Sequence, residues 1–338
     1  MSNIVSFFSG AGGLDLGMIQ AGFKVVYANE FDREIWDTYE HNHRGTELDR
    51  RSIVDVRNDD VPECDGIIGG PPCQSWSEAG SKRGITDHRG QLFFEFIRIL
   101  EAKKPKFFLA ENVSGMLAKR HSEALTNIKK MFSDAGYDLH FQVVNAKDYG
   151  VAQDRKRVIF IGFLKELNID YKFPEPLEKK KYLRDVILDL DGLAQPALEK
   201  QYANKNLVVP NHEYMTGGFS TMYMSRNRVR GWDQPSFTIQ AGGRHAPIHP
   251  SAPAMRKVRT DEFEFIPGHT YRRLSVRECA RIQGFPDDFV FRYDKVPTGY
   301  KMIGNAVPVG LAYHLGLSIN NALRKTRLST STAYLATA

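Results

Sequence analysis

Short apolar runs that alternate with amphipathic stretches dominate the first half of the chain. The apolar runs predict β-strands at residues 4–8, 24–28, 106–110, 137–145 and 157–163. Residues 91–102 and 119–135 place apolar side chains at helical spacing, and Gly136 is a typical stop signal for the second helix. Strands that alternate with helices are typical of an α/β fold built on a parallel sheet.

The alternation is lost between residues 164 and 270. Prolines, glycines and short β-like runs at 223–230 and 237–244 take its place, which indicates a second, irregular domain. Helical character returns at 272–284, and residues 304–308 open a terminal helix.

These patterns together predict the architecture. We expect a doubly wound, mostly parallel sheet with Rossmann-like topology, formed by residues 1–165 and 272–338. Residues 166–271 are expected to form a smaller, irregular domain, with a basic cleft between the two domains.

One stretch, residues 66–74, organises the candidate chemistry. Ile67 and Ile68 read as the end of a buried strand, and two glycines and two prolines then stop that strand abruptly. Cys73 follows at once, at the carboxyl end of the strand, where open α/β sheets place their ligands. The alternative is a tight turn with a small, inert buried thiol.

A glycine turn follows the first predicted strand, as in nucleotide-binding βα units. The full dinucleotide fingerprint needs glycine or alanine at position 15, which is Asp15, so the turn alone is also consistent with a tight βα connection. Glu30, after the second strand, stands at a distance where an acidic residue can bond ribose hydroxyls. The pattern favours a nucleoside-containing cofactor without a pyrophosphate.

Composition narrows the class of protein. The chain has 338 residues, 42% hydrophobic content and a net charge of +6, which permits a polyanionic partner without requiring one. Its 3 cysteines, Cys64, Cys73 and Cys279, argue against a disulfide framework and indicate a reducing compartment. No Cys/His cluster suggests a metal site, and no apolar run or leader suggests a membrane or export, so the expected location is the cytoplasm.

Three further polar segments could carry function or merely be solvated. Residues 75–90 read as a mobile, basic loop, and Glu111 follows a strand, where it could also be a surface carboxylate. For the basic cluster at 153–157, a solvated loop is the interpretation that its composition favours.

The motifs in combination resemble the DNA (cytosine-5)-methyltransferase family. They cover nearly the whole chain in the family's order: FSGAGG at 8–13, NE at 29–30, GPPCQ at 70–74, ENV at 111–113, QDRKR at 153–157, RLSVRE at 273–278 and GNAVP at 304–308. Residues 66–89 and 226–244 resemble, more narrowly, the bacterial HaeIII-type modification methyltransferases, which act on GGCC.

The resemblance implies a mechanism and a set of catalytic residues. The Cys73 thiolate would add to carbon 6 of a flipped-out cytosine, so that carbon 5 can accept a methyl group from S-adenosylmethionine without a metal. Glu111 would protonate or hydrogen-bond nitrogen 3 of the base, which calls for a carboxyl with a raised pKa. Arg157 would contact the base and steady Glu111, and Arg155 would support the site or a phosphate.

The resemblance also implies that residues 166–271 are a target-recognition domain, and it assigns binding residues. One departure is Ser52, which stands where the family has an aspartate on the adenine amino group, although Ile53 could still pack on the ring. The expected cofactor contacts are Phe8, Gly10, Gly12, Gly13, Glu30, Ile53, Pro72, Leu92 and Asn305. The expected DNA contacts are Ser75, Arg83, Arg89, Arg226, Arg228, Arg230 and Arg244.

The partners follow from the same resemblance. We expect a monomer that acts on double-stranded DNA, with a restriction endonuclease for the same site that is not a bound partner. The alternatives are a tRNA cytosine-5 methyltransferase on the same scaffold and an inactive DNA-binding protein with a methyltransferase core. The arginine-bearing insert favours DNA over tRNA, and the retained Cys73, Glu111 and Arg157 favour an active enzyme. A nicotinamide oxidoreductase is disfavoured because the third glycine is missing.

Overall fold

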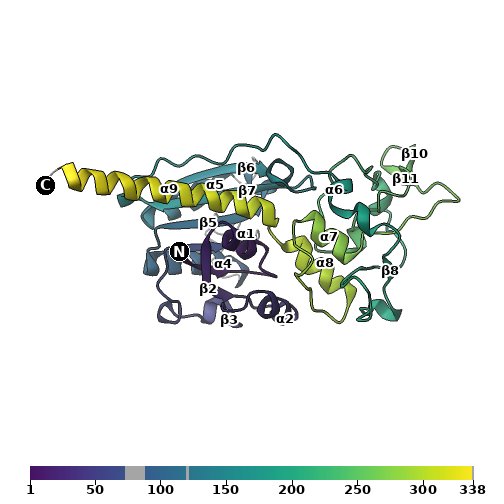
Figure 1. Cartoon of the computed structure of the whole chain (residues 1–338), viewed down its shortest axis with the longest axis horizontal. Helices are drawn as coiled ribbons and strands as arrows, with labels where there is room; N and C mark the ends of the chain where they lie inside the picture. The colour runs from purple at the N-terminus through teal and green to yellow at the C-terminus, as the bar shows by residue number, and fades with distance from the viewer. Residues whose placement is uncertain (73–87, 119–121, 337–338) are drawn as a thin grey trace.

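The computed structural model of the chain describes residues 1–72, 88–118 and 122–336. A sheet of 7 strands, in the order β3-β2-β1-β4-β5-β7-β6, runs through the half of the molecule that carries the N-terminus (Figure 1). The strands are β1 (Ser2–Phe7), β2 (Phe23–Asn29), β3 (Glu47–Asp49), β4 (Gly66–Gly69), β5 (Phe107–Val113), β6 (Tyr137–Asn145) and β7 (Lys156–Leu164).

The strand pairs from β3 to β5 are all parallel, and only β7 pairs antiparallel, with β5 on one side and β6 on the other. The predicted mostly parallel α/β sheet is therefore confirmed.

Helices cover both faces of this sheet. Successive strand residues point to opposite faces, so Ile4 and Val5 of β1 enter two separate core clusters, and each is 0% exposed. Helices α1 (Gly13–Gln20) and α9 (Val309–Ala336) contribute to the first cluster, and α4 (His88–Lys103) and α5 (Ser122–Asp134) to the second. Burial on both faces explains why these strands read as continuous apolar runs.

The other half of the molecule has little regular sheet. Its elements are α6 (Leu183–Ile187), α7 (Val276–Ile282), α8 (Val296–Asn305) and two small sheets, β8 (Gln195–Pro196) with β9 (Glu213–Tyr214) and β10 (Arg256–Arg259) with β11 (Glu262–Glu264).

The β-like runs predicted at 223–230 and 237–244 do not form strands. The structure shows an isolated bridge, Val229 to Ile248, and short 3-10 turns there. Side-chain hydrogen bonds hold these segments instead of the backbone hydrogen bonds of a sheet. The Thr238 hydroxyl, for example, donates to the carbonyl of Asp154.

Packing of the C-terminal helices differs from the expected grouping of residues 272–338. Helix α9 packs on the sheet through Leu311 and Leu315. Helices α7 and α8 instead share a cluster with the irregular half, for example with Leu183 and Ile239. Ala11 joins the same cluster, so one apolar core connects the two halves.

One helical stretch among the described residues, 296–326, is long and apolar enough to cross a membrane, and 67% of its apolar window is buried inside the protein. The core helix of a soluble protein passes the same test, so the stretch is weak evidence for a membrane.

The sheet topology brings the candidate residues together. Because β2, β1, β4 and β5 are parallel neighbours, their carboxyl ends lie along one edge of the sheet. Glu30 follows β2, Phe8 follows β1, and Pro72 lies just beyond β4. Glu111 lies beside them, two residues before the end of β5 at Val113.

We predict that Phe132→Ala lowers the free energy of unfolding by about 3–5 kcal/mol. Phe132 of α5 is 0% exposed and stacks on Phe108 of β5 with ring centroids 4.3 Å apart, so truncation leaves a cavity between helix and sheet. Urea unfolding monitored by circular dichroism measures the loss. Phe31→Ala is the control, because Phe31 is 72% exposed and should change stability by no more than about 0.5 kcal/mol. Equal small losses in both variants would contradict the packing described.

Candidate active site and nucleic-acid interface

A largely buried ion pair joins the two central candidates at the end of β5. Glu111 lies opposite Ile159 of β7, so Arg157, two residues earlier, is its diagonal neighbour on the same face. Nε of Arg157 lies 2.7 Å from Oε1 of Glu111, and each side chain is 12% exposed. Nη1 of Arg157 also donates to the carbonyl of Lys156 at 2.8 Å, which fixes the guanidinium further.

The turn after β4 packs against the same strand end. Nδ2 of buried Asn112 donates to the carbonyl of Pro71 at 3.0 Å. A Cβ built on Gly70 would lie 3.4 Å from Oε2 of Glu111, so the turn backbone passes close to the carboxylate. The predicted Cys73, Ser75 and Arg83 lie outside the described residues, as does the side chain of Arg89.

A cavity of about 390 Å³ opens where the parallel strands end, and we call it the Glu30 cavity. Glu111 and Arg157 line it on the β5 side, and Asp32 and Met302 are lining residues that the sequence did not single out. Of the predicted cofactor residues, it is lined by Phe8, Gly10, Glu30, Pro72 and Asn305.

Backbone amides hold the Glu30 carboxylate in place. Oε2 accepts a hydrogen bond from the amide of Gly10 and Oε1 accepts one from the amide of Asp32, both at 2.8 Å. Burial raises the pKa of Glu30, and these two hydrogen bonds oppose the rise. A carboxylate has lone pairs beyond the two used here, so Glu30 can still accept from ligand hydroxyl groups.

The other predicted cofactor residues are not among the residues that line this cavity. Gly12 has φ +83°, and a Cβ there would lie 2.0 Å from Nε2 of buried His43, so only glycine fits. A Cβ on Gly13 would lie 2.6 Å from the carbonyl of Val307. Ile53 is 1% exposed in the sheet core, and Leu92 packs against that core.

Phe31 is a candidate that sequence reasoning missed. It stands between Glu30 and Asp32, which both line the cavity, yet its side chain is 72% exposed. An exposed aromatic ring beside a cavity offers a flat apolar face to a ligand. The available signal was its position next to Glu30, directly after the second predicted strand.

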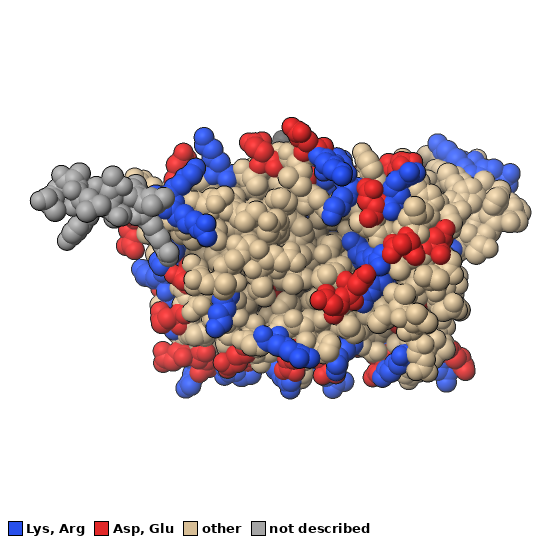
Figure 2. Space-filling view, viewed as in Figure 1, with Lys and Arg blue, Asp and Glu red and all other residues tan. Residues whose placement is uncertain are grey.

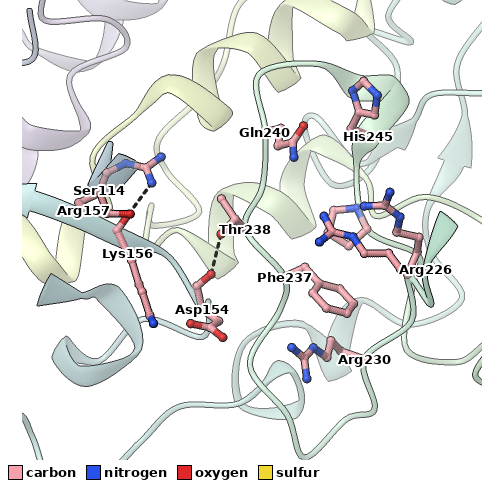
Figure 3. Close-up of a pocket in the computed structure, with 12 residues that line it drawn as sticks. Ser114, Asp154, Lys156, Arg157, Arg226, Arg230, Phe237, Thr238, Gln240 and His245 are labelled. Atoms are coloured by element: carbon pink, nitrogen blue, oxygen red, sulfur yellow. Dashed lines mark hydrogen bonds between the residues drawn. The ribbon is translucent and has the colours of Figure 1, made fainter. Parts of the chain in front are cut away.

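A second cavity, of about 460 Å³, collects basic side chains, and we call it the arginine cavity (Figure 3). In Figure 3, Lys156 and Arg157 lie on one side, and Arg226 and Arg230 lie on the other. Thr238, Gln240 and His245 also line it. Arg157 lines both cavities, so its ion pair with Glu111 stands where they meet.

The charged residues that line the arginine cavity are mostly basic, unlike the mixed charges on the face of the molecule shown in Figure 2. On the face shown in Figure 2, Lys and Arg side chains are interspersed with Asp and Glu. The arginine cavity, in contrast, is lined by Lys156, Arg157, Arg226, Arg228 and Arg230, with Asp154 as its acidic residue. Such a site suits a polyanion even though the net charge is only +6.

The predicted DNA-contacting arginines differ in how firmly they are held. Arg228 is 8% exposed, and its Nε and Nη2 donate to the carbonyls of Tyr223 and Met222 at 2.7 and 2.9 Å. Burial lowers the pKa of Arg228, and nearby Arg226 lowers it further. Arg226 itself is exposed.

The remaining two arginines of this group lie at the edge of the irregular half. The Arg230 guanidinium lies over the Phe237 ring at 4.1 Å. Arg244 is exposed on a short turn next to His245 and is not among the residues that line the arginine cavity.

The solvated-loop interpretation of residues 153–157 is wrong for two of them, because Gln153 is 0% and Arg155 2% exposed. Arg155 donates to the carbonyls of Ile239, Gly304 and Ala306 at 2.9, 2.8 and 3.1 Å. Burial, with a smaller effect of Arg157, lowers the pKa of Arg155 to about 9, so the guanidinium stays charged near neutral pH. These contacts favour a supporting role over a phosphate contact.

Metal-ligating groups are not gathered anywhere in the described ranges: no three His, Cys, Asp or Glu side chains there could hold an ion together. The polar groups at the two cavities are instead a carboxylate paired with an arginine, a second carboxylate held by amides, and basic side chains.

This sheet, with a cavity at the carboxyl ends of its parallel strands, is the Rossmann-like fold of S-adenosylmethionine-dependent methyltransferases. Residues 2–321 match the family described as C-5 cytosine-specific DNA methylase, and the chain belongs to that family. It is therefore a DNA cytosine methyltransferase, an enzyme of restriction-modification systems, which uses S-adenosylmethionine on double-stranded DNA.

Individual relatives agree over nearly the full length. The type II methyltransferase M.FnuDI of Fusobacterium nucleatum is 55% identical over 326 residues, which cover 95% of this chain and 94% of the relative. M.MthTI of Methanothermobacter thermautotrophicus is 55% identical over 324 residues, 95% of this chain and 98% of the relative. A solved methyltransferase structure from Entamoeba histolytica shares the fold, with a TM-score of 0.70, 18% identity and coverage of 96% of this chain and 99% of that chain.

Proposed function

We propose that this enzyme methylates carbon 5 of a flipped-out cytosine within GGCC, through a covalent adduct between Cys73 and carbon 6 of the base. The observation that carries the proposal is the place of the Glu111–Arg157 pair, at the junction of the Glu30 cavity and the arginine cavity. A cofactor in the first cavity and a nucleotide in the second would meet at that pair.

The residues of the Glu30 cavity fit S-adenosylmethionine. Glu30, fixed by two amides, is oriented to accept hydrogen bonds from ribose hydroxyls, and Asn305 offers an amide to the polar end of the cofactor. The exposed ring of Phe31, next to Glu30 and Asp32 of the cavity, would stack on the adenine. When bound there, S-adenosylmethionine supplies an electrophilic methyl group on sulfur.

Carbon 5 of cytosine is a weak nucleophile until the ring is activated. The Cys73 thiolate would form a bond to carbon 6, which moves electrons towards nitrogen 3 and carbon 5. Glu111 would hold a proton at nitrogen 3, and carbon 5 would then bond to the methyl carbon as the bond from that carbon to the cofactor sulfur breaks, which leaves S-adenosylhomocysteine. Loss of the carbon 5 proton and cleavage of the sulfur–carbon 6 bond would regenerate Cys73 and release 5-methylcytosine.

Arg157 would fix the geometry of this step. Its Nε pairs with Glu111 and its Nη1 with a backbone carbonyl, and we assign Nη2 to the exocyclic oxygen of the base. A base stacked in a duplex cannot be approached from above and below its ring, so the target nucleotide must leave the helix at a cost of a few kcal/mol. The basic side chains of the arginine cavity would bind its phosphates and offset part of that cost.

The recognition of GGCC is assigned to arginines of the irregular half. Arginine is the commonest reader of guanine because its fork matches two acceptors in the major groove. The carbonyls that bind Nε and Nη2 of Arg228 orient this side chain before DNA arrives, so less conformational freedom is lost on binding. Arg226, Arg230 and Arg244 complete the set, with some of them holding phosphates.

The biological setting belongs to the same proposal. We assign the enzyme to the cytoplasm as a monomer that protects sites from a separate endonuclease of the same specificity. Bisulfite sequencing of DNA treated with the purified enzyme tests substrate, base and context together, and it should show methylation at GGCC. Transfer to tRNA but not to duplex DNA, or no consumption of S-adenosylmethionine, would contradict the proposal.

Cys73→Ala should abolish methyl transfer while cofactor binding stays largely intact, because no other residue is assigned the attack on carbon 6. In the wild type, 5-fluorocytosine at the target should trap the enzyme, since fluorine cannot leave as a cation after methyl transfer. Denaturing gels should show a DNA adduct that depends on S-adenosylmethionine. An active Cys73→Ala enzyme, or no adduct in the wild type, would count against covalent catalysis.

Glu111→Gln should lower the rate of methyl transfer by about a hundred- to ten-thousand-fold, because the amide cannot supply a proton to nitrogen 3. DNA affinity should change far less. Single-turnover kinetics and fluorescence anisotropy measure the two effects separately. Glu63→Gln is a matched control, since Glu63 is 84% exposed and paired with Lys103. Equal losses of rate and affinity would mean that Glu111 mainly positions the DNA.

Arg228→Ala and Arg244→Ala test the assignment of specificity, and at least one of them should identify a base reader. Loss of a base reader costs about 1–3 kcal/mol and relaxes the preference at one position. Loss of a phosphate contact weakens binding to all sequences alike and lowers the salt slope by about one. Binding to GGCC and its single-base variants over a salt series distinguishes these results, with Arg57→Ala, a change at an 81% exposed side chain, as control. Uniform weakening in both variants would exclude both as readers.

A further inference from the structure

Residues 152–157 form a seam between the two halves of the molecule. The amide of Ser236 donates to the carbonyl of Ala152 at 2.8 Å, and the amide of Asp154 donates back to Ser236 at 2.9 Å. The Thr238 hydroxyl donates to Asp154 at 2.6 Å (Figure 3). Residues 236–240 therefore attach to the start of β7, and part of this segment lines the arginine cavity.

Arg155 lies inside this seam and reaches both cavity walls. Its Nη1 binds the carbonyl of Ile239, next to Gln240 of the arginine cavity. Its Nη2 binds the carbonyls of Gly304 and Ala306, which flank Asn305 of the Glu30 cavity. A guanidinium is planar and rigid, so its donors can satisfy these carbonyls only when both walls hold one relative position.

The surroundings of Gly304 give independent evidence that the two walls are in direct contact. A Cβ at this position would lie 2.2 Å from the carbonyl carbon of Gln240 and 2.3 Å from the amide nitrogen of Ala241. The backbones on either side of the seam thus touch with no side chain between them. Because the two backbones are in contact, a shift of residues 304–306 must also move residues 240–241.

We propose that Arg155 is a positioning residue that couples the cofactor site to the DNA site through this seam. The inference rests on the proposed function, because it takes the Glu30 cavity as the cofactor site and the arginine cavity as the DNA site. A ligand that fixes the position of residues 304–306 therefore also fixes the position of Gln240 in the wall of the arginine cavity. By linkage, each ligand then raises the affinity for the other by the same factor.

Fluorescence anisotropy with a GGCC duplex, with and without saturating S-adenosylhomocysteine, measures the coupling factor as a ratio of two dissociation constants. We expect at least about fivefold coupling in the wild type, within the range typical of coupled sites. Arg155→Lys keeps the charge but cannot reach three carbonyls, so its factor should fall towards one. Gly304→Ala, which inserts a methyl group into the seam, should lower the factor without any change at Arg155.

Arg277→Lys is the matched control for buried arginines. Arg277 is 0% exposed and donates to the carbonyls of Pro210, Pro286 and Phe289 at 3.0, 3.2 and 3.0 Å, but none of these lines either cavity wall near the seam. It should lower the unfolding midpoint in urea as Arg155→Lys does, yet keep the wild-type coupling factor.

The outcomes separate this inference from the function on which it rests. A wild type that methylates GGCC but shows no coupling, or an Arg155→Lys variant with wild-type coupling, overturns the inference alone. If Arg155→Lys does not fold, the Gly304→Ala result decides it in the same way. A wild type that binds S-adenosylhomocysteine or DNA but does not methylate GGCC contradicts the proposed function instead.

Discussion

The ion pair between Glu111 and Arg157 depends on the one antiparallel neighbour of β5. The pairing of Glu111 with Ile159 sets Arg157 at the diagonal position on the same face of the sheet, with its Nε 2.7 Å from the carboxylate. A register shift of one residue would turn Arg157 to the opposite face. The charged pair is 12% exposed on each side, so its loss would leave a largely desolvated charge at the meeting point of the two cavities.

Asp15 occupies the position at which the dinucleotide-binding fingerprint has glycine or alanine, and its contacts give it a structural role. Asp15 is fully buried, and burial raises its pKa. It accepts hydrogen bonds from the hydroxyls of Ser6 at 2.6 Å and Tyr39 at 2.5 Å, and so ties β1 to α2 (Arg33–Asn42) below the glycine turn. The residue that breaks the fingerprint thus supports the turn from behind and leaves the cavity to Gly10 and Glu30.

The sequence was informative wherever local pattern decides structure. The strand predicted at residues 137–145 matches β6, and the polar residues after the first strands do meet at one edge, because parallel topology requires it. A sequence motif does not show which of its residues face a ligand and which face the protein interior. The contacts of Gly12 and Ile53 with a cofactor therefore stay predictions. The structure places Gly12 against His43 and Ile53 in the core.

The arginines show most clearly where sequence reasoning ends. Composition treats Arg155, Arg228 and Arg244 alike, as basic residues in irregular segments. The carbonyls that Arg155 binds lie 84, 149 and 151 residues away in the chain, whereas those that Arg228 binds lie 5 and 6 residues away. Arg155 donates to three carbonyls and Arg228 to two, whereas Arg244 is exposed. A guanidinium already bound to carbonyls loses little side-chain entropy when a ligand arrives, while an exposed one must first be ordered. The carbonyls around each guanidinium, which composition does not reveal, therefore determine how much side-chain freedom each arginine keeps.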